Sequence, residues 1–288
     1  MWNVFNRLEA AGIDRPPLFA LEAMGTRFEL LLPGISDDRA RPISEAVFDV
    51  VLQWHNALNA FSASSFVGRF NCARSGEWVR IDREIWAFLE YCRRVWKRSE
   101  GSFDPALGAP LRSWRQGAPP AAGETARGFQ HVLWNDEDMA VGRSIAIELD
   151  FGSVAKGWAI DRATDLLREL GVREAFLHGG TSTASGIGVG PMGNGWHIQA
   201  VPDLHGPVIR LIDSAMSVSS PRGRSSADGS HHVIDPRTGA SARCPRWAVC
   251  AAPSAADSDA WSTVGLVLGG AASPPEGVMI QLDSTDWV

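Results

Sequence analysis

The spacing of apolar residues changes between residues 145 and 180 from the period of a strand to that of a helix and back. Residues 145–150 carry Ile, Ile and Leu at every second position, which predicts a strand that ends at Asp150. A helix should follow, with Ser153 as a candidate N-cap and Gly171 just past its last turn. Its apolar residues recur at helical spacing: Ala159, Ala163, Leu166, Leu167 and Leu170. Residues 173–177 then predict a short buried strand.

The rest of the chain shows the same mixture of long helical and short extended patterns. Apolar periodicity predicts helices at the ranges 43–58, 83–98 and 254–268. Strands are predicted at residues 17–34 (interrupted at 24–26), 182–189, 196–201, 207–212 and 215–219, and loops at residues 115–127 and 222–230. Long helices among many short strands favour an α+β fold with mixed or antiparallel sheets over a parallel doubly wound sheet.

Composition and charge narrow the class of protein. The chain has 288 residues, 45% hydrophobic and 21% charged, which is typical of a globular protein with an ample core. A net charge of -6 argues against a nucleic-acid partner. The N-terminal region has no apolar stretch of signal-peptide or membrane-spanning length, so we expect a cytoplasmic protein, or a periplasmic one if a longer precursor is processed. The four cysteines show no metal-finger or redox spacing and are expected to be buried or idle thiols.

Lys156 stands out because it lies in the first turn of the predicted helix. A cation there opposes the helix dipole, which favours negative charge by about 0.3–1 kcal/mol. An anion such as phosphate at this helix end would account for the lysine, since the free main-chain N–H groups and the ammonium would bind it together. A lysine that extends into solvent is the alternative, and the spacing alone does not separate the two.

Two further groups of residues could carry chemistry. Asp259 and Thr263 are four residues apart, share a helix face and offer the oxygen ligands that Mg²⁺ takes, although acidic residues in a first helical turn are also common caps. His232 and Asp235 precede a Pro-Arg-Thr-Gly turn, where the pair could act as a general base or simply form the turn. Asp104, before Pro105, likewise has a structural explanation as a turn residue. The chain contains no nucleophile elbow, HExxH or Walker loop.

Several motifs, in one order, resemble the ApbE family of flavin transferases (FAD:protein FMN transferases). The matching segments lie between residues 20 and 270. They are A-M-G-T at 23–26, G-S-F-D-P-A-L-G-A-P-L at 101–111, L-D-F-G-S-V-A-K-G-W-A-I-D at 149–161, G-G at 179–180, H-H-V-I-D-P-R-T-G at 231–239 and D-A-W-S-T at 259–263. Each segment is weak alone, and their common order makes the resemblance specific.

The resemblance implies a fold and a reaction. It implies a single α+β unit over residues 1–288, related to the T-fold, with FAD in a cleft and Mg²⁺ on the FAD pyrophosphate. Such enzymes move FMN from FAD onto a Thr or Ser of a partner flavoprotein through a phosphoester bond and release AMP. The implied roles are cofactor binding for Met24, Thr26, Asp104, Lys156, Asp161, Gly179 and Gly180; Mg²⁺ binding for Asp259, Thr263 and the main-chain oxygen of Ala155; and catalysis for Lys156 and for His232 helped by Asp235.

Three positions depart from the family pattern. The loop after the first helix offers Phe61 or Phe66 where the family has a Tyr that stacks on adenine, Thr181 follows Gly179-Gly180 in place of Asp or Asn, and Val218-Ser219-Ser220-Pro221 replaces Thr-Ser-Gly. Two alternatives to the transferase therefore stay open. One is an FAD pyrophosphatase that gives FMN and AMP, and the other is a non-catalytic protein that binds FAD or another nucleotide.

Overall fold

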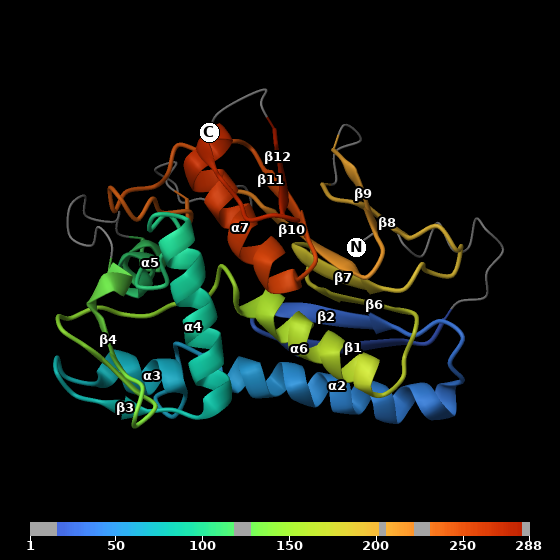
Figure 1. Cartoon of the computed structure of the whole chain (residues 1–288), viewed down its shortest axis with the longest axis horizontal. Coiled ribbons are helices and arrows are strands. Elements are labelled where there is room, and N and C mark those ends of the chain that lie inside the picture. The colour runs from blue at the N-terminus through green and yellow to red at the C-terminus, as the bar shows by residue number, and fades with distance from the viewer. Residues whose placement is uncertain (1–15, 118–127, 202–205, 222–230, 284–288) are drawn as a thin grey trace.

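A seven-stranded antiparallel sheet forms the centre of the molecule (Figure 1). The computed structural model describes residues 16–117, 128–201, 206–221 and 231–283. The sheet order is β1 (Leu18–Ala23), β2 (Thr26–Leu31), β6 (Ala175–Gly179), β7 (Thr183–Ile187), β10 (Ser214–Ser219), β11 (Ala248–Ala252) and β12 (Met279–Leu282). Neighbouring strands are antiparallel throughout.

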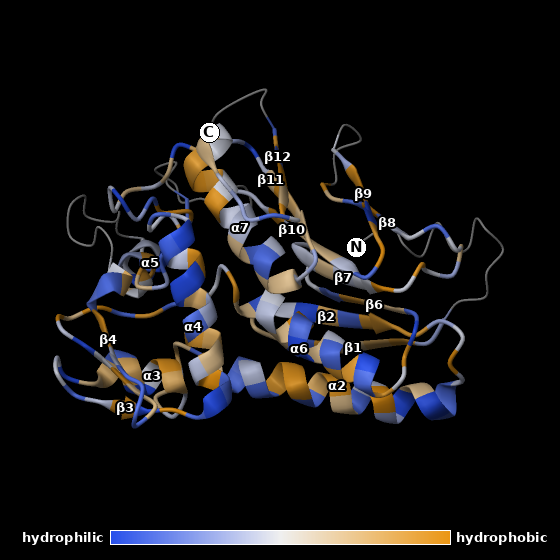
Figure 2. Ribbon diagram, viewed as in Figure 1, coloured by the Kyte–Doolittle hydropathy of each residue, from blue (hydrophilic) through white to orange (hydrophobic). Residues whose placement is uncertain are grey.

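The sheet has a helical layer on one face and a small hairpin on the other. Helices α2 (Asp37–Leu58), α6 (Ala155–Glu169) and α7 (Ala255–Leu268) cover the first face, and strands β8 (Trp196–Gln199) and β9 (Val208–Leu211) pack on the second. Because side chains alternate along a strand, Leu30 of β2 enters the helix-side core and Leu31 the hairpin-side core. Figure 2 shows α7 mainly apolar or neutral along its length, in keeping with its burial between sheet and neighbours.

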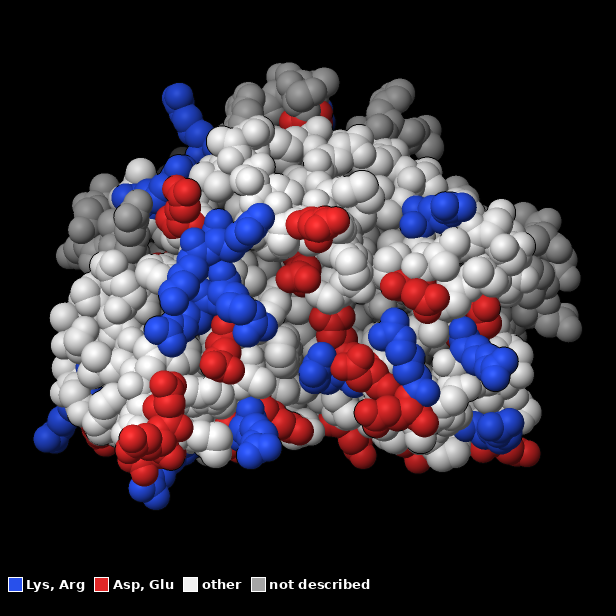
Figure 3. All heavy atoms as spheres, viewed as in Figure 1, with Lys and Arg blue, Asp and Glu red and all other residues white. Residues whose placement is uncertain are grey.

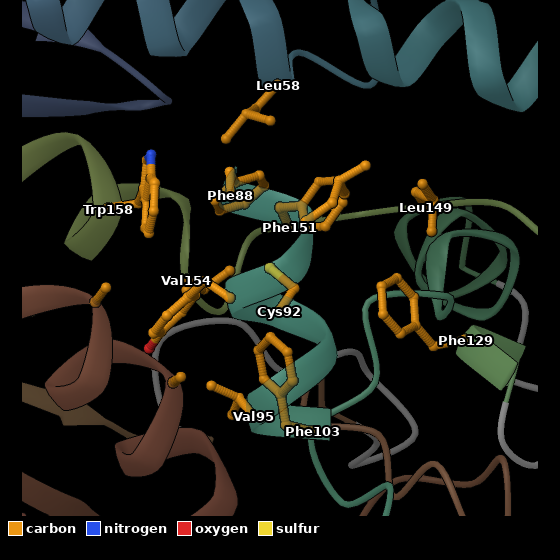
Figure 4. Packing of buried hydrophobic residues seen from close by; sticks show 14 of the residues in the cluster. Leu58, Phe88, Cys92, Val95, Phe103, Phe129, Leu149, Phe151, Val154 and Trp158 are labelled. Atoms are coloured by element: carbon orange, nitrogen blue, oxygen red, sulfur yellow. The ribbon is translucent and has the colours of Figure 1, made fainter. Parts of the chain in front are cut away.

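A second group of elements packs beside the helical layer. It consists of α3 (Phe66–Cys72), α4 (Arg83–Arg98), α5 (Gly108–Arg115), the 3-10 turn η1 (Gly128–His131), and a sheet in the order β3 (Val79–Arg80), β5 (Ala140–Arg143) and β4 (Val132–Asn135). A second 3-10 turn, η2 (Gly269–Ala271), directly follows α7. An aromatic core joins the second group to α2 and α6. The Phe88 ring of α4 lies 5.2 Å from Trp158 of α6 and 4.9 Å from Phe151 (Figure 4). Rings of this size bury large apolar areas, so this contact fixes α4 against the N-terminal half of α6.

The expected α+β architecture with antiparallel sheets and packed helices is confirmed, and most predicted elements are present. The range 83–98 coincides with α4, whose N-cap Asp82 accepts a hydrogen bond from the Ile85 N–H. Helix α2 begins at Asp37, six residues before its apolar periodicity starts. The predicted strands at residues 17–34 form the β1–β2 hairpin. The loop at 222–230 and most of that at 115–127 lie outside the described residues.

The predicted strand ending at Asp150 is wrong. Residues 145–150 run without a strand partner, and their main chain bonds instead to the segment that begins α5. The Asp150 N–H donates to Pro105 O (2.8 Å), and Glu148 O accepts from the Gly108 N–H (2.9 Å). Ser153 is not the N-cap either, because Val154 occupies that position. Ile147 and Leu149 are buried in the core, as their alternation suggested, but Ile145 is 48% exposed and no strand pairs with these residues.

Candidate active site

Helices α6 and α7 approach closely at Gly157, and this crossing places Lys156 beside Asp259. The Gly157 N–H donates to Asp259 Oδ2 (3.0 Å), and Lys156 Nζ lies 3.6 Å from the same oxygen. A Cβ at Gly157 would lie 2.2 Å from the main-chain oxygen of Ala255, so only glycine permits this approach. The Asp259 carboxylate is buried, with an ammonium and a main-chain N–H of the first turn of α6 on one oxygen.

Hydroxyl groups from the central sheet surround the other oxygen of Asp259. Thr183 Oγ1 of β7 and Ser217 Oγ of β10 both lie 3.2 Å from Asp259 Oδ1. One turn further along α7, Thr263 Oγ1 lies 3.4 Å from Ser219 Oγ. Thr183 and Ser217 could not be recognised from the sequence, because the pairing of β7 with β10, not proximity in the chain, brings them to α7.

Asp161 of α6 also connects the two helices, through the N-terminus of α7. Its carboxylate accepts hydrogen bonds from the main-chain N–H groups of Ala255 (2.6 Å) and Ala256 (2.9 Å), at the N-terminus of α7. Burial raises the pKa of Asp161 to about 6, although both of these hydrogen bonds oppose the shift. The carboxylate therefore serves as an N-terminal cap supplied by a neighbouring helix.

Two tight turns lie together at one end of the sheet. Met24 (φ 52°) and Gly25 (φ 70°) form the two-residue turn between β1 and β2. Both have positive φ, a strained conformation for Met24, and such strain is found preferentially at functional sites. Thr26 Oγ1 would lie only 2.3 Å from a Cβ built on Gly180, so the two turns touch. Since Gly179 pairs with Thr183 across β6 and β7, these turns adjoin the Asp259 cluster.

Asp104 lies in a buried loop between α4 and α5. Its Oδ1 accepts from the N–H groups of Ala106 (2.7 Å) and Phe129 (3.1 Å). Burial raises the pKa of Asp104 to about 6, and these two hydrogen bonds oppose the shift. The carboxylate thus connects the segment before α5 to η1.

The 231–239 segment is held by main-chain hydrogen bonds to residues 240–242 and by an internal ion pair. The Asp235 carboxylate is bound by the Arg237 side chain, with Oδ2 2.7 Å from a terminal guanidinium nitrogen. Burial alone would raise the pKa of Asp235, but its hydrogen bonds and charge interaction with Arg237 outweigh this and lower it. The His232 ring lies beside Trp114 of α5, with a centroid separation of 5.9 Å. Arg115, next to Trp114, donates to Asp150 (2.9 Å), so α5 connects the His232 segment to the loop before Lys156.

One aromatic ring on the loop after α2 is exposed. Phe66 is buried in the core, whereas Phe61 is 83% exposed. The guanidinium carbon of Arg115 lies 5.5 Å from the centroid of the Phe61 ring. Of the two phenylalanines in this loop, only Phe61 offers a face to a ligand.

A surface cavity of about 360 Å³ opens between α2, α3 and α4. Its lining is mostly polar and includes Asn56 of α2, Asn59 and Ser62 of the loop that follows, and Arg69 of α3. Of the residues singled out from the sequence, only Phe66, one of the two rings offered at the adenine position, lines it.

The profile of the ApbE family matches residues 24–275. The chain belongs to the ApbE family. The resemblance seen in its motifs is thereby confirmed.

Relatives and solved structures of the ApbE family agree with this assignment. A protein of Treponema pallidum named FAD:protein FMN transferase is 28% identical over 257 residues, covering 78% of this chain and 71% of that protein. A protein of the same name from Klebsiella pneumoniae is 26% identical, covering 73% of this chain and 69% of that protein. The crystal structure of the ApbE protein from Thermotoga maritima superposes with a TM-score of 0.78 at 26% identity, covering 88% of this chain and 87% of that one. The apo flavinyl transferase ApbE of Pseudomonas stutzeri, 21% identical, has the same fold with a TM-score of 0.78 over 93% of this chain and 95% of that one.

The Asp259 cluster of this ApbE protein has a donor set suited to Mg²⁺. Carboxylate, hydroxyl and main-chain oxygens are the hard ligands that Mg²⁺ prefers, and the ion commonly uses one or two carboxylates together with water and substrate phosphate. No group of three or more His, Cys, Asp or Glu side chains with metal-binding geometry occurs in the described part of the chain. A metal here would therefore depend on Asp259, on hydroxyls and on the ligand itself. The four cysteines are free, with Cys72 exposed and the other three buried.

Proposed function

We propose that this chain is a Mg²⁺-dependent FAD:protein FMN transferase that attaches FMN to a Thr or Ser of a partner flavoprotein. The observation that carries the proposal is the contact of Asp259 with Lys156 and the Gly157 N–H at the start of α6. A buried carboxylate, an ammonium and a helix N-terminus at one point suit a pyrophosphate bound through a cation. The names of the ApbE relatives supply the reaction.

The reaction transfers a phosphoryl-linked group from one oxygen to another. The acceptor hydroxyl oxygen attacks the phosphorus on the FMN side of FAD, the new P–O bond forms, and the bond to the bridging oxygen breaks so that AMP leaves with that oxygen. The hydroxyl proton passes to a base. Catalysis of this kind rests on positioning and on neutralising charge at phosphorus.

Different residues of this chain are proposed to hold the metal, supply positive charge and act as the base. Asp259, Thr263 and the main-chain oxygen of Ala155 would hold Mg²⁺, which when bound neutralises phosphate charge. Lys156 contributes a second positive charge at the same point. His232 is proposed as the base. Asp235 supports His232 by fixing the conformation of the turn, because the Asp235 carboxylate is already bound by the Arg237 side chain.

The isoalloxazine and adenine ends of FAD would be bound by separate parts of the site. Met24, Thr26, Gly179 and Gly180 form the paired turns beside the Asp259 cluster, and a Cβ built on Gly25 of the first turn would meet nothing within 4 Å, which leaves room there for a flat ligand. Phe61 and Arg115 offer an aromatic face and a cation that together suit adenine, in place of the family's Tyr. Asp104 and Asp161 contribute by holding the segments around them, since their carboxylates bind main-chain N–H groups.

The proposal is tested by following both products of FAD. The protein is incubated with FAD and Mg²⁺, with and without EDTA and with and without a Thr-containing peptide, and AMP, FMN and peptide mass are measured. AMP together with a peptide heavier by FMN, both lost with EDTA, is the expected result. Free FMN with an unchanged peptide under every condition would favour the pyrophosphatase, and intact FAD in all samples the binding protein.

Two substitutions examine the assigned roles. Asp259→Asn keeps an oxygen for the Gly157 N–H but removes the charge, and should reduce turnover by at least about a hundredfold, as loss of a metal ligand or charge-stabilising group commonly does. His232→Ala should lower the rate of transfer while FAD binding, measured by flavin fluorescence, changes little. Full activity in Asp259→Asn would remove the metal assignment, and loss of FAD binding in His232→Ala would make His232 a substrate contact.

A further inference from the structure

The C-terminal half of α4 concentrates positive charge on the surface. Arg93, Arg94, Lys97 and Arg98 fall within six residues that contain no acidic side chain, in a chain whose net charge is -6. Arg94, Lys97 and Arg98 are exposed, and their spacing places them on one face of the helix. Figure 3 shows the largest gathering of Lys and Arg on this view over α4. We name these four residues the α4 basic patch.

The four residues of the α4 basic patch form no ion pair within the described parts of the protein, although Glu90 and Glu100 flank them in the sequence. By contrast, Arg112, Arg115 and Arg162 each bind a carboxylate. Two of them contact aromatic rings, with Arg93 4.7 Å from the Trp134 centroid and Arg94 5.8 Å from the Tyr91 centroid. The helix dipole favours Lys97 and Arg98 in the last turn, but it does not account for Arg93 and Arg94.

The patch is connected to the candidate active site through Tyr91. The Tyr91 hydroxyl donates to Asp257 Oδ1 (2.9 Å) on α7, two residues before Asp259. The guanidinium group of Arg94 lies over the ring of the same tyrosine. A partner bound on α4 would therefore lie against the helix pair that carries the Asp259 cluster (Figure 1).

We propose that the α4 basic patch docks an acidic segment of the protein that receives FMN. This rests on the proposed transferase, which needs a protein partner whereas a pyrophosphatase needs none. Unpaired surface cations attract an oppositely charged partner from solution and orient it before contact, chiefly by raising the association rate. The substrate therefore includes an acidic surface as well as the Thr or Ser that reacts.

Direct binding tests the patch independently of catalysis. A fluorescein-labelled deca-glutamate peptide is titrated with the protein in about 50 mM NaCl, where Debye screening is weak, and fluorescence anisotropy is measured. Arg94→Glu/Lys97→Glu is compared with Arg39→Glu/Arg41→Glu, two exposed arginines of α2 that also lack ion pairs in the described chain. Both variants carry a net charge of -10 (-6 less 4), so general repulsion is matched.

The patch variant should bind the peptide at least about tenfold more weakly than the α2 variant, because only the first loses a local charge partner. Equal weakening in the two variants, or no binding by the unmodified protein, would overturn the proposal. A deca-thymidine oligonucleotide is titrated in parallel. Tighter patch-dependent binding of the oligonucleotide than of the peptide would assign the patch to nucleic acid instead.

Transfer kinetics connect the patch to the reaction. Two acceptor peptides carry the same Thr segment, with either a Glu-rich or a Ser/Gly extension. The acidic extension should lower KM about tenfold with little change in kcat for the unmodified and α2 variant proteins, and the advantage should disappear in Arg94→Gln/Lys97→Gln. An advantage retained in that variant contradicts docking on α4. Absence of AMP in all samples would instead refute the transferase, and the anisotropy result would still decide the patch.

Discussion

Gly157 carries no side chain at the point where α6 and α7 cross, and a methyl group there has no room. In Gly157→Ala the new Cβ would meet the Ala255 carbonyl oxygen at 2.2 Å and Asp259 Cβ at 2.8 Å. The helices must separate, which overpacking data place at about 1–3 kcal/mol of unfolding free energy. Urea unfolding followed by tryptophan fluorescence measures the loss, and FMN transfer should fall with it because Lys156 moves away from Asp259.

Gly270→Ala is the matched control for that substitution. A Cβ at Gly270 has nothing within 4 Å, and its backbone does not require positive φ. Its unfolding free energy should stay within about 0.5 kcal/mol of the unmodified protein or rise slightly. Similar behaviour of the two alanine variants would show that the helix crossing tolerates a side chain and would weaken the account of the site.

Asp104 should make stability depend on pH in a direction unusual for a carboxylate. Its pKa is raised by burial from 3.8 to about 6 in the folded chain, so the folded state binds the proton more tightly. The stabilisation is complete below pH 3.8 and is lost as the pH rises through about 6. Asp104→Asn keeps one oxygen for the Ala106 and Phe129 N–H groups and removes the titration.

From pH 4 to pH 7 the unmodified protein should therefore lose about 2–3 kcal/mol of unfolding free energy relative to Asp104→Asn. Urea unfolding at several pH values measures it. Asp104→Ala is the control, since it leaves both N–H groups unpaired and should be less stable than Asn at every pH. A difference that does not vary with pH would mean that Asp104 titrates normally.

The sequence predicted the positions of single residues better than their partners. The juxtaposition of Lys156 with Asp259 came from the family resemblance, not from spacing, because 103 positions separate them (259 less 156). Thr183 and Ser217 gave no signal, since a serine or threonine in a strand is ordinary. Arg237 was read only as part of a turn, and its ion pair with Asp235 depends on side-chain geometry that no periodicity encodes.

At the scale of elements, α7 depends on a cap from α6. Asp161→Ala removes the acceptor for the Ala255 and Ala256 N–H groups, leaving two buried donors at the start of α7. Loss of such a cap costs about 1–2 kcal/mol, and fraying here would also shift Asp259, so both stability and transfer should fall. Thermal unfolding and AMP release measure the two effects.

Asp165→Ala, four residues later on α6, is the control. Asp165 pairs with Arg162 and Arg168 on the partly exposed face of the helix and touches no end of α7. Exposed pairs contribute little, so a loss below about 0.5 kcal/mol with normal activity is expected. Equal losses in the two variants would contradict a specific capping role for Asp161.

The elements predicted correctly from periodicity were those that bury one face along their whole length. Helix α4 was predicted to the residue because its apolar residues form a strict stripe along one face. Residues 145–150 failed because alternating burial does not say whether a strand or a loop lies alongside. Strands β11 and β12 were not predicted, since short apolar segments near α7 gave no separate period.

At the scale of the whole molecule, the candidate site is built from the central sheet, the helical layer and α5. The central sheet supplies the paired turns and the hydroxyls of β7 and β10, the helical layer supplies Lys156 and Asp259, and α5 supports His232. The sequence could predict the helical layer and the sheet as separate patterns. Their relative placement depends on the antiparallel strand order, in which β2 pairs with β6, and this is not visible in local spacing.

A ligand that contacts these parts together should stabilise the folded chain as a whole. FAD at about a hundredfold its Kd should add about 2.7 kcal/mol, which raises Tm by roughly 5 °C for a chain of this size. If Mg²⁺ is bound between Asp259 and FAD, the shift measured by calorimetry should be larger with Mg²⁺ than with EDTA. In Asp259→Asn the shift should be the same with Mg²⁺ as with EDTA, because the carboxylate that joins the metal to α7 is gone. Comparing shifts rather than Tm values removes any effect of the substitution on the unliganded protein. A Mg²⁺-dependent shift of full size in Asp259→Asn would place the metal elsewhere, and an equal shift in unmodified protein with and without EDTA would show that FAD binds without it.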